Sequence, residues 1–160
     1  MKNPERSIVI CDANIIIDYS SCDMFLLTAM TRLFQKVYVP YLVLYELTDV
    51  SEKALIDARI ELMETSIETS PVKGLSTEDW ACVLAVKQTE GLCITNDRKL
   101  RSVVSDMGYD VLWGLETLLE MWRNRIITKA KAKKCGLGIC ERNMYISADV
   151  KRDFLEKLSQ

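Results

Sequence analysis

Short apolar runs that stop at polar residues alternate along the chain with longer segments of helical periodicity. Nearly continuous apolar character over about four to eight residues is typical of strands buried on both faces of a parallel sheet. Such runs cover residues 7–14, 36–40, 92–96 and 110–114, with a weaker one at 67–72. Helical spacing covers residues 22–35, 41–49, 52–66, 76–91 and 97–108. The alternation predicts βαβ crossovers, and hence an open parallel sheet with helices on both faces.

Beyond the last apolar run the pattern becomes entirely helical, over residues 115–126, 127–136 and 147–160. Val150, Phe154 and Leu158 recur at intervals of four and form one apolar stripe, which predicts a helix docked on its own core. Gly91 and Gly108 precede expected strands and are predicted to be left-handed helix caps. We therefore expect a main domain at 1–122 and a basic helical extension at 123–160 packed on it.

The composition favours a single globular domain. The chain has 160 residues, 49% of them hydrophobic, and no apolar run approaches the roughly 20 residues that a membrane span needs. No segment resembles a signal peptide, so we expect a soluble cytoplasmic protein without a membrane partner. The six cysteines lie mostly in apolar segments, and the chain has no histidine. Reduced thiols are therefore expected rather than a disulfide framework or a structural zinc site.

The net charge of −2 hides an asymmetry between the two parts of the chain. Residues 1–122 hold 11 Lys+Arg against 19 Asp+Glu, whereas residues 123–160 hold 10 against 4. The parts therefore carry charges of −8 and +6. A basic segment on an acidic body favours a polyanion or an acidic partner, and an ordinary solvated surface is the competing interpretation.

Four carboxylates stand at positions where a parallel sheet places functional groups. Asp12 and Asp97 end two of the apolar runs, and the carboxyl ends of parallel strands meet at one edge. Glu46 lies in an otherwise apolar segment, where burial is costly unless a cation or donors satisfy it. Asp79 precedes an apolar helical run. Four acids that converge on one edge repel each other, and ligands made only of oxygen suit Mg²⁺ or Mn²⁺.

Helix capping is the competing interpretation of three of these acids. A short carboxylate at a helix start accepts free backbone N–H groups, so Asp12 and Asp97 also fit N-cap positions. Ser76 and Asp79 match the S-x-x-D form of a capping box. Taken singly, each of these acids is explained by capping, whereas Glu46 has no such explanation.

Four segments together resemble the acidic motifs of PIN-domain nucleases, the family that includes toxins of the VapC type. In order and spacing they are "VICDANIIID", "LYELTD", "STEDWACVLA" and "LCITNDRKLR". The resemblance covers about residues 7–120. Any one motif alone would be weak evidence, but the four together, in this order and spacing, are specific. It implies a three-layer α/β/α sandwich with a central parallel sheet in the order 3-2-1-4-5. It also implies a ribonuclease that depends on a divalent metal.

The resemblance carries over to individual residues. Asp12, Glu46, Asp79 and Asp97 match the acidic quartet, predicted to be catalytic and to bind Mg²⁺ or Mn²⁺. Asn14, Thr95 and Asn96 match polar positions that would orient ligands or water. Thr95 is equally consistent with an ordinary β-branched strand residue. Asp18 and Glu78 lie outside the matched positions, and we interpret them as surface groups or as supports behind the ligands.

The missing histidine also bears on the mechanism. Without an imidazole base, the nucleophile would be water activated by one or two metal ions. The family resemblance implies products with a 5′-phosphate and a 3′-hydroxyl. Arg98, Lys99 and Arg101 follow Asp97 and are candidates for binding flanking RNA phosphates. A solvated helix face is the alternative for these basic residues.

The sequence thus predicts a metal-dependent endoribonuclease that cuts single-stranded or structured RNA, as the toxin of a toxin–antitoxin module with a small antitoxin protein as partner. The alternatives are a housekeeping RNA-processing nuclease and a non-catalytic PIN-like domain that binds RNA or protein. Residues 123–160 depart from a minimal toxin of the family, which weakens the toxin role more than the nuclease role. Because PIN-domain proteins commonly pair and residues 24–34 are strongly apolar, we expect a homodimer, with intramolecular packing of that helix as the alternative.

Overall fold

A parallel sheet of five strands forms the centre of the computed structural model, which describes residues 3–144 and 146–160. The strands are β1 (Ile8–Cys11), β2 (Lys36–Pro40), β3 (Glu61–Met63), β4 (Leu92–Ile94) and β5 (Val111–Leu112). Their order is β3-β2-β1-β4-β5, and every neighbouring pair is parallel. The predicted sheet and strand order are confirmed.

The central strand explains why the apolar runs are almost continuous. Val9, Ile10 and Cys11 of β1 are fully buried, because helices cover both faces of the sheet and β1 is paired with β2 on one side and β4 on the other. Val9 pairs with Val37 on one side and with Leu92 on the other. In the same register Cys11 pairs with Ile94, which brings the residues after β1 and β4 to the same level.

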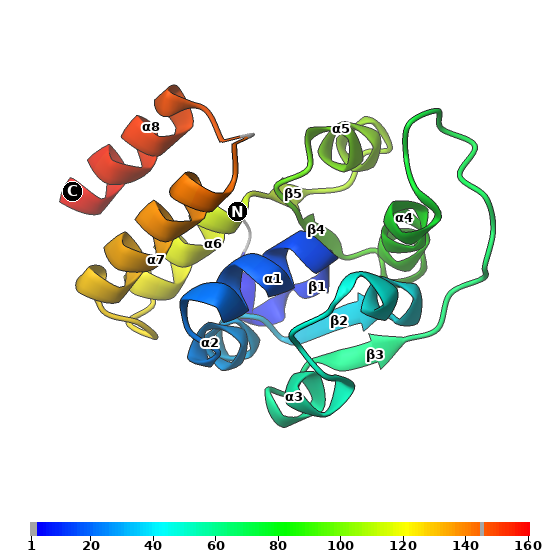
Figure 1. The fold of residues 1–160 in the computed structure, drawn as a ribbon, viewed down its shortest axis with the longest axis horizontal. Helices are drawn as coiled ribbons and strands as arrows, with labels where there is room; N and C mark the ends of the chain where they lie inside the picture. The colour runs from blue at the N-terminus through cyan, green and yellow to red at the C-terminus, as the bar shows by residue number, and fades with distance from the viewer. Residues whose placement is uncertain (1–2, 145) are drawn as a thin grey trace.

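Helices form the two outer layers of the sandwich (Figure 1). One layer holds α1 (Ala13–Cys22), α2 (Phe25–Leu33), α3 (Glu52–Asp57) and α6 (Gly114–Arg123), and the other holds α4 (Thr77–Thr89) and α5 (Arg98–Asp106). Two short 3-10 helices, η1 (Pro4–Arg6) and η2 (Tyr41–Glu46), complete this part of the chain. The α/β/α sandwich predicted from the sequence is therefore confirmed.

The last two helices, α7 (Lys129–Arg142) and α8 (Ala148–Ser159), gather with α6 at one side of the molecule (Figure 1). Helix α7 also packs on α1, and α8 packs on both α6 and α7. Phe154 and Leu158 are buried, so the predicted apolar stripe faces the protein's own core. Helix α7 runs further than the predicted segment 127–136 and brings Arg142 to α1.

The third strand was misplaced in the sequence prediction. Segment 67–72 forms no strand, and β3 lies inside the predicted helix 52–66. Helix α3 stops at Asp57 because Arg59 adopts a left-handed backbone with φ of 67°, and the amide of Ile60 then donates to the carbonyl of Leu55 at 2.9 Å. Helices often end at a glycine in the left-handed conformation, and here an arginine takes that position. Without a glycine to mark the helix end, the predicted helix was extended past Asp57 to residue 66.

Two further local predictions need correction. The left-handed residue after α4 is Glu90, with φ of 51°, and not Gly91. Gly91 is needed for a different reason, since a Cβ atom there would lie 2.6 Å from the carbonyl oxygen of Ile8. Gly108 does adopt the expected left-handed conformation, with φ of 87°. Helix α1 was not predicted at all, although it begins at the carboxylate that opens the candidate site.

No helix in the described part of the chain is long and apolar enough to cross a membrane. All six cysteines are free thiols, as expected from their apolar surroundings.

Candidate active site

Asp12 follows β1 directly and is almost completely buried, with 3% of its surface exposed. One carboxylate oxygen, Oδ1, accepts a hydrogen bond from the amide of Ile15 at 3.1 Å and thereby caps helix α1. The second oxygen, Oδ2, accepts a hydrogen bond from the hydroxyl of Thr95. Capping therefore accounts for Oδ1 alone, whereas the hydrogen bond to Oδ2 links the end of β1 to the end of β4.

Thr95 links two acids of the predicted quartet. Its hydroxyl donates to Asp12 and accepts a hydrogen bond from the amide of Asp97 at 3.0 Å. The carboxylate of Asp97 in turn accepts from the amide of Leu100 at 2.9 Å and caps α5. Thr95 is therefore more than an ordinary strand residue, because its side chain fixes the first and last acids relative to each other.

Asp79 lies in the first turn of α4 and takes part in the predicted capping box. The hydroxyl of Ser76 accepts a hydrogen bond from the amide of Asp79 at 3.0 Å. The backbone and hydroxyl of Ser76 hydrogen-bond to the Asp79 carboxylate in return, and these bonds lower its pKa. Burial has the larger effect and raises that pKa overall, and the charge of Asp97 adds to the rise.

The acids influence each other most clearly at Asp12. Burial raises the pKa of Asp12 from 3.8 to about 7. The hydrogen bonds from Thr95 and Ile15 oppose this rise, whereas the charges of Asp79 and Asp97 increase it. Three acids from the starts of α1, α4 and α5 therefore share one electrostatic environment at the carboxyl end of the sheet.

Glu46 differs from the sequence expectation because its side chain is exposed and not buried in the apolar segment. It is the last residue of the 3-10 helix η2, in which Val43 is the buried residue. Partial desolvation is the largest cause that raises the pKa of Glu46, and the charges of Asp79 and Glu78 add to it. Glu46 is therefore coupled to the other acids through Asp79, from the rim of the cluster.

The donor chemistry of this cluster fits a hard divalent cation. Its ligating atoms are all carboxylate oxygens, and in residues 3–144 and 146–160 no ion pair joins any of the four acids to a lysine or arginine. The arrangement is open: among those same residues, no three His, Cys, Asp or Glu side chains stand close enough to hold one ion. The carboxylates thus affect one another electrostatically, but they do not form a closed coordination shell.

The three predicted orienting residues have different positions. Thr95 bridges two acids, and Asn96 is buried with 4% of its surface exposed. The side chain of Asn96 donates to Asp18 at 3.1 Å and accepts from the amide of Gly114 at 2.9 Å. Asn14 is exposed on α1. Asp18 is buried, which excludes the surface group and leaves the alternative of a support behind the ligands. Its place among the isoleucines of α1 was the available signal.

The three basic residues after Asp97 also separate into two kinds. Arg98 and Lys99 are exposed at the start of α5 and remain candidates for phosphate contact. Arg101 is half-buried, with its guanidinium 4.1 Å from the ring centre of Trp113 and 3.9 Å from the carboxylate of Glu116. Its Nη1 atom is buried and has no hydrogen-bond partner in the described residues. This position favours packing over phosphate binding for Arg101.

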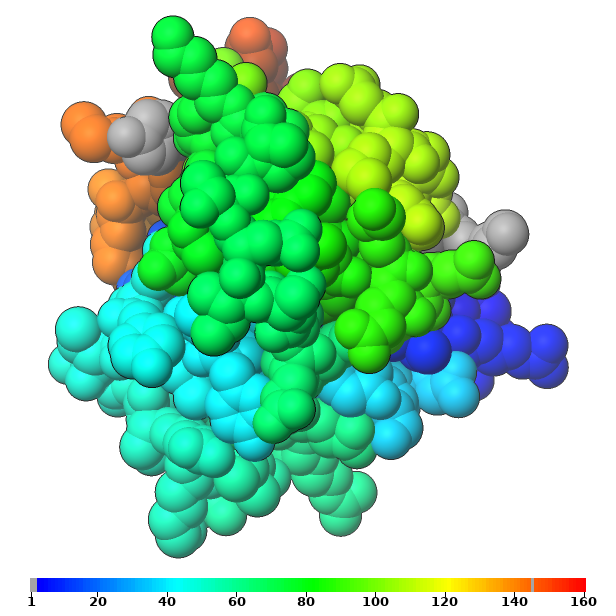
Figure 2. All heavy atoms as spheres, turned by 90° about the vertical axis from the view of Figure 1, so that its right-hand side faces the viewer, coloured from blue at the N-terminus to red at the C-terminus, as the bar shows by residue number. Residues whose placement is uncertain are grey.

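The face of the molecule at which the strands end is the one seen in Figure 2. Asp12 and Asp97 follow β1 and β4 on the chain and begin helices there. Residues 64–76, which join β3 to α4, run across this face (Figures 1 and 2). An apolar groove of about 570 Å³ adjoins Glu46 and is lined by Tyr41, Leu42, Leu44, Tyr45, Glu64, Thr65 and Ile67. Tyr45 is 83% exposed and Ile67 77%. Aromatic and apolar surface therefore lies on residues adjacent in sequence to Glu46.

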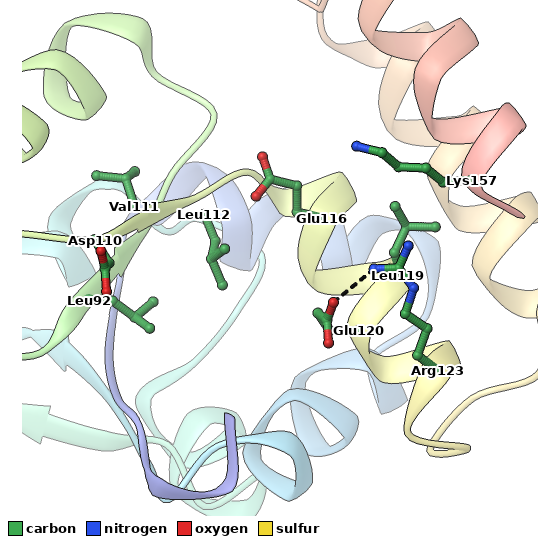
Figure 3. Close-up of a pocket in the computed structure, with 9 residues that line it drawn as sticks. All are labelled: Leu92, Asp110, Val111, Leu112, Glu116, Leu119, Glu120, Arg123 and Lys157. Atoms are coloured by element: carbon green, nitrogen blue, oxygen red, sulfur yellow. Dashed lines mark hydrogen bonds and ion pairs between the residues drawn. The ribbon is translucent and has the colours of Figure 1, made fainter. Parts of the chain in front are cut away.

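A second cavity, of about 350 Å³, lies away from the cluster, between β5 and helices α6 and α8 (Figure 3). It has carboxylates and cations on an apolar floor, and Arg123 pairs with Glu120 there at 2.9 Å. Its lining residues are Leu92, Asp110, Val111, Leu112, Glu116, Leu119, Glu120, Arg123 and Lys157. None of the four predicted acids lines it, so this cavity is separate from the candidate active site.

Comparison with known proteins supports the family suggested by the motifs. A family model described as a PIN domain matches residues 8–160 and thus includes the C-terminal helices. A PilT N-terminus domain protein from the hyperthermophilic archaeon Sulfolobus solfataricus P2 has a similar structure, with a TM-score of 0.58 and 10% identity, over 71% of this chain and 92% of that chain. This likeness shows the fold alone. The sequence matches no curated protein at a significant level.

PIN domains are generally nucleases, and they typically bind divalent metals. The first and last acidic motifs include strands β1 and β4 of the expected sheet, and the other two lie on η2 and α4. The family model matches nearly the whole chain. The chain is therefore a member of the PIN-domain family.

Proposed function

We propose that the protein is an endoribonuclease that depends on Mg²⁺ or Mn²⁺. The observation that carries the proposal is the convergence of Asp12, Asp79 and Asp97 on one sheet edge, with no cationic side chain paired to them in the described residues. Mutual repulsion of this kind is relieved by a divalent cation. Family membership supports nuclease chemistry at this position.

Each residue has a role that follows from its place. Asp12, Asp79 and Asp97, with Glu46 at the rim, would have to move closer together to hold the ion, because no three of these side chains in the described residues are yet close enough. Thr95 links Asp12 to the amide of Asp97. When bound, the ion would activate a water molecule and offset the charge that develops on the phosphate. Arg98 and Lys99 are exposed beside Asp97 and would bind the flanking phosphates. Products with a 5′-phosphate and a 3′-hydroxyl are expected.

The groove beside Glu46 supports a single-stranded substrate. Exposed aromatic side chains stack on unpaired bases, at about 1–3 kcal/mol per base. Tyr41 and Tyr45 offer such surfaces, with 43% and 83% of their surface exposed. Tyr45→Ala is expected to weaken binding of single-stranded RNA. It should not weaken binding of an RNA whose nucleotides next to the cleavage site are abasic, because no base is then present to stack on Tyr45. Equal weakening for both RNAs would remove this support.

The decisive experiment measures RNA cleavage with the metal present and with it removed. Cleavage in Mn²⁺ or Mg²⁺, its loss in excess EDTA and products with a 5′-phosphate are the expected results. Asp12→Asn and Asp97→Asn should abolish cleavage while the protein stays folded, because an asparagine caps a helix about as well but lacks the ligand charge. Asp106→Asn, an exposed acid of α5 outside the cluster, is the matched control and should cleave normally. Undiminished cleavage in chelator would reject the proposal.

The biological setting that we propose is a toxin–antitoxin module in the cytoplasm. Expression should then arrest growth, and a small protein encoded next to the gene should relieve the arrest. An active nuclease without growth arrest would indicate a housekeeping RNA-processing role. Absence of cleavage combined with RNA binding would indicate the non-catalytic alternative.

Homodimer formation is part of the same proposal. Helix α2 buries Leu26, Leu27 and Met30 in its own core, so the contact surface would instead involve the apolar residues at the α1–α2 junction. Ile17, Met24 and Phe25 are 39%, 44% and 39% exposed there. Light scattering should show a dimer, and Phe25→Glu should shift it to a monomer. A monomer of wild-type protein at high micromolar concentration would contradict the proposal.

A further inference from the structure

Helix α1 holds two successive residues of the loop that carries Asp97. Asp12, at the start of the helix, accepts a hydrogen bond from Thr95, and Asp18, further along the same helix, accepts one from Asn96 at 3.1 Å. The two acids differ in setting, because Asp12 belongs to the acidic cluster and Asp18 faces away from it into the protein. Asp18 is 8% exposed and Asn96 4%, so both ends of the second bond are shielded from water.

Asn96 is also held from the opposite direction by α6. The amide of Gly114 donates to Oδ1 of Asn96 at 2.9 Å, while the hydroxyl of Tyr19 on α1 donates to the carbonyl of Gly114 at 2.6 Å. A Cβ atom on Gly114 would lie 3.2 Å from both polar atoms of the Asn96 side chain. The amide group of Asn96 is therefore fixed at both ends, directly before Asp97 in the chain.

The C-terminal helices supply the outer support of Asp18. Arg142, the last residue of α7, donates from Nη2 to the backbone carbonyl of Asp18 at 3.1 Å and to the sulfur of Cys22 at 2.9 Å. Burial raises the pKa of Asp18, and the hydrogen bonds from Asn96 and Asn143 and the charge of Arg142 oppose that rise. The extension thus touches the same buried carboxylate that holds the loop of the candidate site.

We propose that Asp18 is a positioning residue of the nuclease site, and that Arg142 in the C-terminal extension holds it in place to set the position of Asp97 through Asn96. The inference rests on the proposed function, because Asp97 is taken as a metal ligand. Asp18 touches neither metal nor RNA in this arrangement. Outer partners that orient ligand-bearing groups typically change metal affinity or activity by about 10- to 100-fold when they are removed.

Binding of Mn²⁺ alone, measured by calorimetry, tests this role without RNA. Asp18→Ala is expected to weaken Mn²⁺ affinity about 10-fold or more. Asp18→Asn should recover most of it, because the amide oxygen still accepts from Asn96. Thr31→Val is the matched control, since it removes a hydrogen bond from α2 to the carbonyl of Ala58, and neither residue belongs to this network. The control should lose stability and keep its Mn²⁺ affinity.

RNA kinetics provide a second readout. Asp18→Ala should lower kcat and leave KM for RNA nearly unchanged, because Asp18 is buried and offers no surface to the substrate. If Asp18→Ala does not fold, Arg142→Met carries the same test from the exposed end of the network, with a smaller loss of Mn²⁺ affinity. Unchanged Mn²⁺ affinity in a folded Asp18→Ala or Arg142→Met variant overturns the inference.

Failure of the proposed function would look different. A wild-type protein that neither binds Mn²⁺ nor cuts RNA would reject the nuclease, and amide hydrogen exchange in metal-free protein would then decide the positioning role. The amides of Asp97 and Gly114 should exchange faster in Asp18→Ala than in wild type, because both are bonded within the Thr95–Asn96 loop. The amide of Ile10 in β1 should keep its protection. Equal protection of Asp97 and Gly114 in both proteins rejects the inference.

Discussion

At the scale of single residues, burial of a carboxylate without a cation makes stability depend on pH. The pKa of Asp12 is about 7, against an ordinary value of 3.8, chiefly because the side chain is buried. The folded state therefore binds the proton more tightly than the unfolded state does. Asp12 stabilises the fold most fully below about pH 4, and this contribution is lost as the pH rises through about 7.

Asp12→Asn should remove this pH dependence in metal-free protein. Relative to wild type, the free energy of unfolding of the variant is expected to rise between pH 4 and 8, by at most on the order of 4 kcal/mol. Denaturant unfolding in EDTA at several pH values measures it, with Asp106→Asn as a control for a lost surface charge. A difference that stays constant over this range would mean that Asp12 titrates normally in the folded state.

The basic residues after Asp97 should respond to substitution in two ways. Removal of two phosphate contacts from single-stranded RNA reduces the slope of log K against log salt by about 1.4. Arg98→Ala/Lys99→Ala is expected to show this change with little loss of stability, because both side chains are exposed. Arg101→Ala should keep the slope and lower the melting temperature, since it removes the contact with Trp113. A lower slope in Arg101→Ala and an unchanged slope in the double variant would instead assign phosphate binding to Arg101.

The sequence predicted the positions of the acids in the fold better than those of the residues that contact them. Asp12 and Asp97 end apolar runs, and that position alone places them at the carboxyl edge of a parallel sheet. For Asp18 the sequence left a surface group and a support behind the ligands as alternatives, because the choice depends on a hydrogen bond to Asn96, which is 78 positions away in the sequence. Periodicity also could not show that Arg101 packs on Trp113, because only tertiary contacts decide how far such a side chain is buried.

At the scale of elements, the predicted alternation of strands and helices was correct where the hydrophobic periodicity and the helix-capping residues indicated the same boundaries. It failed at α3 and β3, where Arg59 turns the chain without a glycine and the apolar residues of β3 continue the helical period. It also failed at α1, where Asp12 and Asn14 mark the end of β1 but the three consecutive isoleucines that follow show no helical spacing. Short elements beside other apolar segments are therefore the ones that one sequence resolves least.

The contact between α7 and α8 depends on a missing side chain. A Cβ atom on Gly136 would lie 2.2 Å and 2.3 Å from two ring carbons of the buried Phe154. Alanine favours a helix by about 1 kcal/mol over glycine, whereas overpacking a core costs about 1–3 kcal/mol. We expect Gly136→Ala to be net destabilising, by about 1 kcal/mol in denaturant unfolding.

Gly138→Ala on the same helix is the matched control, because its Cβ would meet only the end of Arg142 at 3.3 Å and the sulfur of Cys22 at 3.4 Å. That variant should be neutral or more stable than wild type. Phe154→Leu, combined with Gly136→Ala, should recover part of the loss by removing the ring. Equal stability of the two alanine variants would show that the α7–α8 contact is loose.

At the scale of the whole molecule, the extension has two separable roles. Its apolar residues, including Ile139, Phe154 and Leu158, are buried against the rest of the protein, which is a contribution to stability. Arg142 instead reaches α1 and the buried Asp18. Because α8 contributes to the first role and α7 to both, shortening the chain in two steps distinguishes them.

A chain that ends at Met144 loses α8 but keeps Arg142 and Asn143. It is expected to melt at a lower temperature than the full chain, because the surface covered by Phe154 and Leu158 becomes exposed, and to retain Mn²⁺ affinity at temperatures where it is folded. A chain that ends at Arg125 loses α7 as well, so it should lose stability further and bind Mn²⁺ more weakly, since nothing then holds Asp18 from outside. Thermal melting identifies the temperatures at which each chain is folded, and calorimetry with Mn²⁺ is compared only there. Full Mn²⁺ affinity in the folded shorter chain would show that residues 1–125 bind the ion without the later helices, and would leave those helices with a stabilising role alone.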